Sequence, residues 1–225
     1  PKERWGLKEI EEQYGAYKAN ILPMLDDLGM RREISPVESK YDQLLLLGAS
    51  ITGVEFRVKY VLDLWEKGGI RFNKISLLGG KRAMNESEEE ALNELDWQDQ
   101  KRPKTELEMM EFVWGNKELP QGLQDIEVHL IDAPMKPNPR DSSKPFRPTT
   151  KDTFIEWQKE NPNPGSCLII SSNPFVGRQH LAAKEFVPNA ETVGQPTDPG
   201  DFVAVHMREI ASWVHEVLGG KNKTA

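Results

Sequence analysis

The apolar residues of this chain gather into short continuous runs, and segments with helical periodicity separate them. Four runs lie at about 43–47, 73–78, 126–131 and 167–171, and a fifth short one is expected near 191–194. Continuous apolar runs of this length are typical of strands that are buried on both faces. The pattern therefore predicts a parallel sheet whose strands alternate with helices.

Between these runs, apolar residues recur at steps of three and four, which is the spacing of one helix face. Helices are expected over about 7–28, 53–67, 105–114, 149–159 and 203–218, with one more after Pro174. Strands that alternate with helices predict an α/β fold, here a three-layer Rossmann-like parallel sheet with helices on both faces. We expect an N-terminal helical extension over 1–41 and one α/β domain over 42–225.

Two segments break this alternation. Residues 85–104 are acidic and polar, which favours a solvated helix or a mobile flap. The segment at about 133–148 holds five prolines and four basic residues, so it cannot form regular structure. We interpret it as an insertion that forms a long ordered loop or a lid.

Right-handed crossovers place every strand-to-helix loop at the same edge of a parallel sheet. Small residues dominate these loops: Gly48, Ala49 and Ser50 after the first strand, Gly79 and Gly80 after the second, and Ser171, Ser172 and Asn173 after the fourth. Glycine lets the backbone approach a ligand closely, and the N–H groups that open the next helix attract negative charge. We expect an anionic ligand at this edge.

Charged residues near the same loops are candidates for binding and catalysis. The cations expected to hold the anion are Arg57, Lys81, Arg147 and Arg178. Glu106 and Asp152 would act as acid or base beside Arg178, with the Thr150 hydroxyl near the ligand. Each of these residues also has an alternative role that involves no ligand. Lys81 would be an exposed lysine, Arg57 would form a surface ion pair and Arg147 would be a loop residue. Helix capping is the alternative for Glu106, Thr150 and Asp152.

Several common sites are not indicated. The chain has no G-x-G-x-x-G, no G-x-x-x-x-G-K-[ST] and no G-x-S-x-G, which disfavours a classical dehydrogenase, a kinase and a serine hydrolase. The four histidines lack metal-ligand spacing, so no metal site is expected, although Mg²⁺ held by carboxylates and a ligand phosphate stays open. The single cysteine, Cys167, lies in an apolar run and is interpreted as a buried structural thiol.

The net charge of −7 disfavours nucleic acid or an anionic membrane surface as a general partner. No stretch approaches the roughly 18–20 apolar residues of a transmembrane helix, and no secretory signal pattern is visible. A cytoplasmic location is the expectation. Because the chain begins at Pro1, a removed targeting segment stays open.

The order of the motifs resembles a bacterial domain family of unknown function typified by YdcF, SanA and ElyC. The matching elements are Leu44–Ser50 with Arg57, then Leu78-Gly79-Gly80, then Thr105-Glu106 or Ser87-Glu88, then Thr150–Thr153, and last Ser171–Arg178. Together they cover about residues 42–218. This chain has Thr153 where the family has Asn, and Phe175 where it has His.

The resemblance implies a Rossmann-like fold, with S-adenosylmethionine binding reported for one branch and envelope or lipid-carrier roles inferred for another. Our leading hypothesis is a protein that binds a nucleotide-like or phosphate-bearing small molecule and catalyses hydrolysis or group transfer on it. Two alternatives stay open. One is a non-catalytic S-adenosylmethionine or nucleotide sensor, which Phe175 suggests, and the other is a protein-interaction module that uses the proline-rich insertion.

Overall fold

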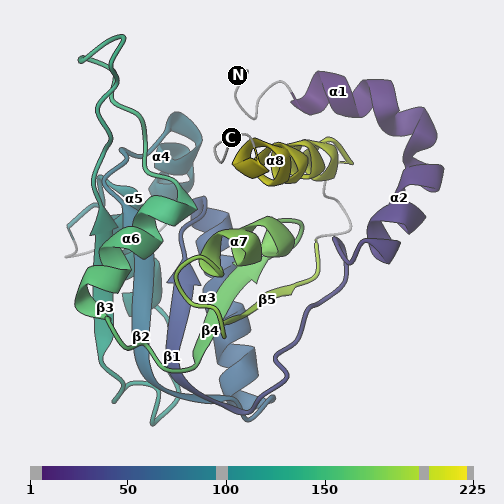
Figure 1. The fold of residues 1–225 in the computed structure, drawn as a ribbon. Helices are drawn as coiled ribbons and strands as arrows, with labels where there is room; N and C mark the ends of the chain where they lie inside the picture. The colour runs from purple at the N-terminus through teal and green to yellow at the C-terminus, as the bar shows by residue number, and fades with distance from the viewer. Residues whose placement is uncertain (1–6, 95–100, 198–202, 222–225) are drawn as a thin grey trace.

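Five parallel strands form one central sheet in the computed structural model, which describes residues 7–94, 101–197 and 203–221 (Figure 1). The strands are β1 (Lys40–Leu47), β2 (Arg71–Gly80), β3 (Val128–Ala133), β4 (Cys167–Ser172) and β5 (Glu191–Gln195). Their order across the sheet is β3-β2-β1-β4-β5. The predicted α/β, Rossmann-like parallel sheet is confirmed.

Helices cover both faces of this sheet (Figure 1). They are α1 (Leu7–Tyr14), the 3-10 helix η2 (Gly15–Tyr17), α2 (Lys18–Asp27), α3 (Ile51–Glu66), α4 (Glu86–Asn93), α5 (Glu106–Gly115), α6 (Thr150–Glu160), α7 (Val176–Ala183) and α8 (Val203–Lys221). Helices α3 and α5 pack on one face, and α6 and α7 pack on the other. Helix α8 contacts α7 and also α1 and α2, so it forms an outer layer.

The central strand β1 shows why the apolar runs are continuous. Leu44 and Leu46 belong to the core under α3 and α5, whereas Leu45 and Leu47 belong to the core under α6. All four side chains are fully buried. Since successive side chains of a strand point to opposite faces, only an unbroken apolar run can fill both cores.

Several element boundaries differ from the prediction. The helix expected over 7–28 is interrupted by η2 at Gly15, a residue with low helix propensity, and ends as expected at Gly29, whose φ is +68°. Strand β3 runs two residues further than expected, because Asp132 and Ala133 still pair with Gly79 and Gly80. In the acidic stretch, α4 forms, and residues 95–100 lie outside the described ranges.

The segment after α2 closes the open edge of the sheet. Ile34 and Gly194 exchange two backbone hydrogen bonds of 2.9 and 3.0 Å, so the segment pairs with β5 in antiparallel orientation. The Asn173 side-chain amide, at the end of β4, donates to the carbonyls of Gly29 and Arg32. An edge strand exposes unpaired backbone groups, and this segment satisfies those of Gly194.

The proline-rich insertion is an ordered loop that rises from the carboxyl edge at β3 (Figure 1). Lys136 and Phe146 exchange backbone hydrogen bonds of 2.8 and 2.9 Å, and the Asn138 amide donates to the Lys144 carbonyl. At its base, Pro148 lies so close to Gly80 that a Cβ on Gly80 would be 2.3 Å from its ring. Within the described residues, no helix combines the length and apolarity needed to cross a bilayer.

Gly79 is a packing position. A Cβ there would lie 3.0 Å from the Cα of Leu107 and 3.0 Å from the sulfur of Met110, both on α5. Gly79→Ala should therefore push α5 away from β2 and cost about 1–3 kcal/mol of unfolding free energy. Urea denaturation measures this cost. Gly15→Ala, which meets nothing within 4 Å, is the control, and equal stability of the two variants would contradict the packing role.

Candidate functional site

The strand order reverses between β1 and β4, and this position defines the candidate site. These two strands are neighbours, yet the helices that follow them, α3 and α7, pack on opposite faces of the sheet. A crevice therefore opens outside their carboxyl ends, where open α/β sheets hold ligands.

A groove of about 840 Å³ begins at this crevice and follows α3. Three predicted ligand-binding residues line it: Ser50 at the start of α3, and Ser172 and Asn173 at the end of β4. The other lining residues come mainly from α3 and from the ends of β4 and β5: Glu33, Thr52, Gly53, Phe56, Lys59, Tyr60, Asp63, Leu64, Lys67, Gly68, Phe175, Gln195, Pro196 and Thr197. Its volume lies in the range of small-molecule sites.

The walls of the groove are partly aromatic. Phe56 is 51% exposed although it lies in the second turn of a packed helix, and Phe175 and Tyr60 line the same space. The Tyr60 hydroxyl donates to Glu33 at 2.8 Å, which fixes its ring. Asp63 and Lys67 form an ion pair further along α3. The groove thus offers hydroxyl groups at the sheet edge and aromatic rings beside them.

The amino terminus of α3 lies at the end of the groove that Ser50 lines. Ser50 has extended backbone angles and its hydroxyl accepts from the Gly53 N–H at 3.4 Å, so it is the N-cap of α3. The partial positive charge of this helix end therefore faces the residues that line the crevice.

Arg57, on α3, connects the ends of β1 and β4 at the crevice. Its guanidinium donates to the carbonyls of Leu47 and Gly48, both at 2.8 Å, and to the Ser172 hydroxyl at 3.1 Å. The side chain is only 1% exposed. Arg57 was expected to hold the ligand anion, but the structure gives it a different role, which is to tie the end of β1 to the end of β4.

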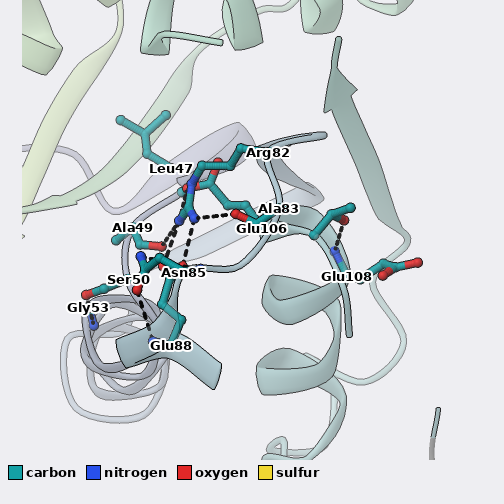
Figure 2. A network of polar contacts seen from close by, with 12 residues as sticks. Leu47, Ala49, Ser50, Gly53, Arg82, Ala83, Asn85, Glu88, Glu106 and Glu108 are labelled. Carbon is teal, nitrogen blue, oxygen red and sulfur yellow. Dashed lines mark hydrogen bonds and ion pairs between the residues drawn. The ribbon is translucent and has the colours of Figure 1, made fainter. Parts of the chain in front are cut away.

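A buried charge cluster lies on the other side of the turn at 48–50 (Figure 2). The guanidinium of Arg82, in the loop after β2, donates to both carboxylate oxygens of Glu88 at 2.8 Å and to Glu106 at 3.0 Å. It also donates to the Ala49 carbonyl at 3.3 Å. Since Ser50 lines the groove and Ala49 contacts the cluster, the same turn connects both.

Glu106 is the predicted catalytic residue that the structure places in this cluster. It is the first residue of α5, after the N-cap Thr105. Its Oε1 lies 2.9 Å from the position that a Cβ on Gly48 would occupy, so Gly48 is required for this approach. Burial raises the pKa of the Glu106 carboxyl above its usual value, Arg82 and Arg57 offset this in part, and Glu88 adds to it.

Asp152 and Arg178 are not brought to Glu106. Asp152 accepts from the Thr149 N–H and hydroxyl, both at 2.6 Å, and from Lys136 at 2.7 Å, so it caps α6 and fastens the insertion. Arg178 binds Glu209 at 2.6 Å and Glu216 at 3.3 Å, so its guanidinium faces α8. The sequence left open whether these three residues converge, and in the structure each of them binds different partners.

The remaining candidates have structural contacts. Gly79 and Gly80 pack against α5 and Pro148 rather than leaving space for a ligand. Lys81 is exposed and lies 3.7 Å from Asp132, and Arg147 is an exposed residue of the insertion.

The Thr150 carbonyl accepts from the Thr153 hydroxyl, and the buried Ser171 hydroxyl donates to Gln179. Cys167 is fully buried, which raises the pKa of its thiol to about 12.

Arg82 was missed from the sequence, and Glu88 was named only in the alternative Ser87-Glu88 match to the family motif, without a role in the site. Arg82 follows the Lys81 that was proposed instead, and only the direction of each side chain distinguishes them. Glu88 has a sequence signal, because Asn85-x-x-Glu88 is a capping box, and both halves of that box form in the structure. The signal did not predict burial, yet Glu88 is only 2% exposed. The interpretation of the acidic run as fully solvated is therefore wrong at this residue.

The described residues contain no group of three or more His, Cys, Asp or Glu side chains arranged to hold a metal ion. Comparison of the chain with protein-family models, with curated proteins and with solved structures gives no match. The fold defines the chain as a Rossmann-like α/β protein, and its resemblance to the YdcF-like family stays a prediction.

The capping role of Asp152 predicts a pH-dependent contribution to stability. Burial alone would raise the pKa of this carboxyl, but the hydrogen bonds from Lys136 and Thr149 outweigh burial and lower it below its usual value. Asp152→Asn should therefore cost about 1 kcal/mol at neutral pH. The cost should disappear as the pH falls below the ordinary value of 3.8 and through the lowered pKa.

Urea denaturation at several pH values measures this effect. Asp27→Asn, at an exposed position near the end of α2, is the control and should change stability little at any pH. A cost for Asp152→Asn that stays constant from pH 7 to pH 3 would contradict the electrostatic explanation.

Proposed function

We propose that this protein binds a nucleotide-like or phosphate-bearing small molecule in the groove along α3 and catalyses hydrolysis or group transfer on it. The observation that carries the proposal is the groove of about 840 Å³ at the point where the strand order reverses. It is large enough to enclose a nucleotide-sized ligand, and Ser50 and Ser172 lie at its upper end. Open α/β sheets hold ligands at this position.

The chemical character of the groove fits the proposed ligand class. A planar ring would pack against Phe56 and Phe175, because flat rings of ligands and aromatic side chains stack favourably. Hydroxyl groups would bind Ser50, Ser172 and Thr52, and a negative group would lie at the amino terminus of α3. Lys59 adds one positive charge in the groove.

Glu106 supplies the proposed acid/base group. A carboxyl whose pKa is raised by burial retains its proton closer to neutral pH, as a general acid requires. Glu106 is not among the residues that line the groove, so the proposed reaction requires the reacting end of the ligand to extend past Ser50 to this carboxyl. There Glu106 donates its proton to the leaving group and takes a proton back from water. Gly48, where a Cβ would collide with Glu106, belongs to the turn that continues into the groove at Ser50.

Phe175 favours a second candidate function, which is binding without catalysis. Phe175 lines the groove at the position where the resembled family has a histidine that could move protons. A protein of this kind would bind S-adenosylmethionine or a nucleotide as a sensor. Ligand-dependent stabilisation with no turnover of any stabilising compound would favour this candidate.

Phe56→Glu tests the binding site. Nucleotides, sugar nucleotides and S-adenosylmethionine are screened by thermal shift, with and without Mg²⁺. A ligand at a hundred times its Kd contributes about 2.7 kcal/mol, which raises the melting temperature by about 5–10 °C for a chain of this size. Phe56→Glu should abolish the shift, because it removes the ring contact and adds a charge that repels anions.

Ile155→Glu is the matched control, since Ile155 is similarly exposed but lies on α6 at the opposite face of the sheet. It should leave the ligand-induced shift unchanged. A stabilising ligand that binds Phe56→Glu as tightly as the unsubstituted protein would exclude the groove.

Glu106→Gln tests the acid/base role on whichever compound stabilises the protein. Without a proton to donate, turnover should fall about 10²–10⁴-fold, while the ligand-induced thermal shift is retained. The control is Glu108→Gln, because Glu108 is in the same helical turn but lies apart from the cluster (Figure 2). Its carboxylate accepts from the Lys104 N–H and from Lys101 instead. Unchanged turnover of Glu106→Gln would refute this role.

A further inference from the structure

In the buried cluster, Arg82 makes unequal contacts with the two carboxylates. Arg82 forms a bidentate pair with Glu88 through both of its terminal nitrogens, whereas Glu106 accepts from only one of them. Bidentate arginine–carboxylate pairs are the stronger arrangement. Arg82 therefore makes a two-point contact with Glu88 and a one-point contact with Glu106.

Glu88 is fixed independently of Arg82. The backbone N–H and the side-chain amide of Asn85 both donate to its Oε2, at 3.0 and 2.8 Å. The capping box of α4 thus holds the carboxylate in place before any contact with Arg82 is counted. Side-chain exposure is 3% for Glu88, 13% for Arg82 and 14% for Glu106, so water screens these charges poorly.

From this geometry we propose that Glu88 is a positioning residue for the site: its two-point pairing fixes the guanidinium of Arg82 so that Glu106 contacts only one guanidinium nitrogen at the turn that leads into the groove. The inference rests on the proposed function in one respect, which is the use that Glu106 makes of its proton. Without Glu88, both terminal nitrogens of Arg82 would be available to Glu106, which favours the ionised form of that carboxyl. If Glu88 has this role, the acidic helix α4 is part of the site.

The charged groups that act on Glu106 come from three elements. Arg82 lies in the loop after β2, Glu88 lies on α4, and Arg57 lies on α3. The guanidinium of Arg57 is held by the carbonyls of Leu47 and Gly48, so its charge stays fixed when the other two are altered. Changes at positions 82 and 88 can therefore be attributed to those residues.

The experiment is a carbon-13 NMR titration of the carboxyl groups, with the Glu106 resonance assigned by Glu106→Gln. Glu88→Gln should lower the pKa of Glu106 by about one unit, because it removes a neighbouring negative charge and frees Arg82. Arg82→Gln should raise this pKa instead, because it removes the positive charge. A purely structural role of the cluster does not predict shifts of opposite sign.

Two matched controls accompany these variants. Glu89→Gln changes the same charge one residue away, where Glu89 binds Arg102 instead, and Lys81→Gln removes the exposed cation beside Arg82. Neither should move the Glu106 pKa by more than a few tenths of a unit. If Glu88→Gln does not fold, Arg82→Gln still tests the premise that Arg82 acts on Glu106, and an unchanged or lowered Glu106 pKa in that variant overturns the proposal.

The proposal is overturned if Glu88→Gln and Glu89→Gln shift the pKa equally, or if Glu88→Gln raises it. The titration needs no substrate, so its failure is distinct from failure of the proposed function. If the pKa moves as expected but Glu106→Gln leaves turnover unchanged, the positioning by Glu88 holds and the acid/base role of Glu106 fails.

Discussion

The site depends on one buried side chain, Arg57. The parallel strands β1 and β4 end side by side at the crevice. Arg57 satisfies the carbonyls of Leu47 and Gly48 and reaches the Ser172 hydroxyl on the next strand. A buried cation is tolerated only where hydrogen bonds replace its hydration, and this one has three. Because of this tie, the turn after β1 and the end of β4 keep a fixed separation, which defines the mouth of the groove.

The turn at 48–50 faces the groove on one side and the charge cluster on the other. On the side of β4 it presents Ser50 and the start of α3 to an open groove. On the side of β2 it presents Gly48 and the Ala49 carbonyl to the charge cluster. Binding and proton transfer would therefore use separate sets of residues joined by three residues of backbone. A bulky side chain at 48 would displace Glu106 and the turn together, which explains why glycine serves the site here while Gly79 and Gly80 serve packing.

The sequence predicted the fold well because fold and sequence pattern have the same physical cause. Continuous burial of β1 requires Leu44 to Leu47, and the helix ends at Gly29 and Thr105 follow from local backbone chemistry. The site was predicted only in part. Ser50, Ser172, Asn173 and Glu106 lie where the topology placed them, but Arg57, Arg178 and Asp152 bind groups of the protein itself. Whether an arginine meets a ligand or an internal carboxylate depends on side-chain direction and on residues distant in sequence, such as Glu209, and periodicity contains neither.

The internal pairing of the arginines constrains what the groove can recognise. Arg57, Arg82 and Arg178 all bind protein groups, and Arg147 lies on the insertion, next to the Pro148 that packs against Gly80, and does not line the groove. At the groove itself, an anion would meet backbone N–H groups of α3 and lysine ammonium groups rather than a bidentate arginine. Such contacts are weaker and less directional, so the ring and hydroxyl groups of the ligand must supply most of the specificity. The groove is consequently better suited to a ligand with a single charged group at one end than to a polyphosphate.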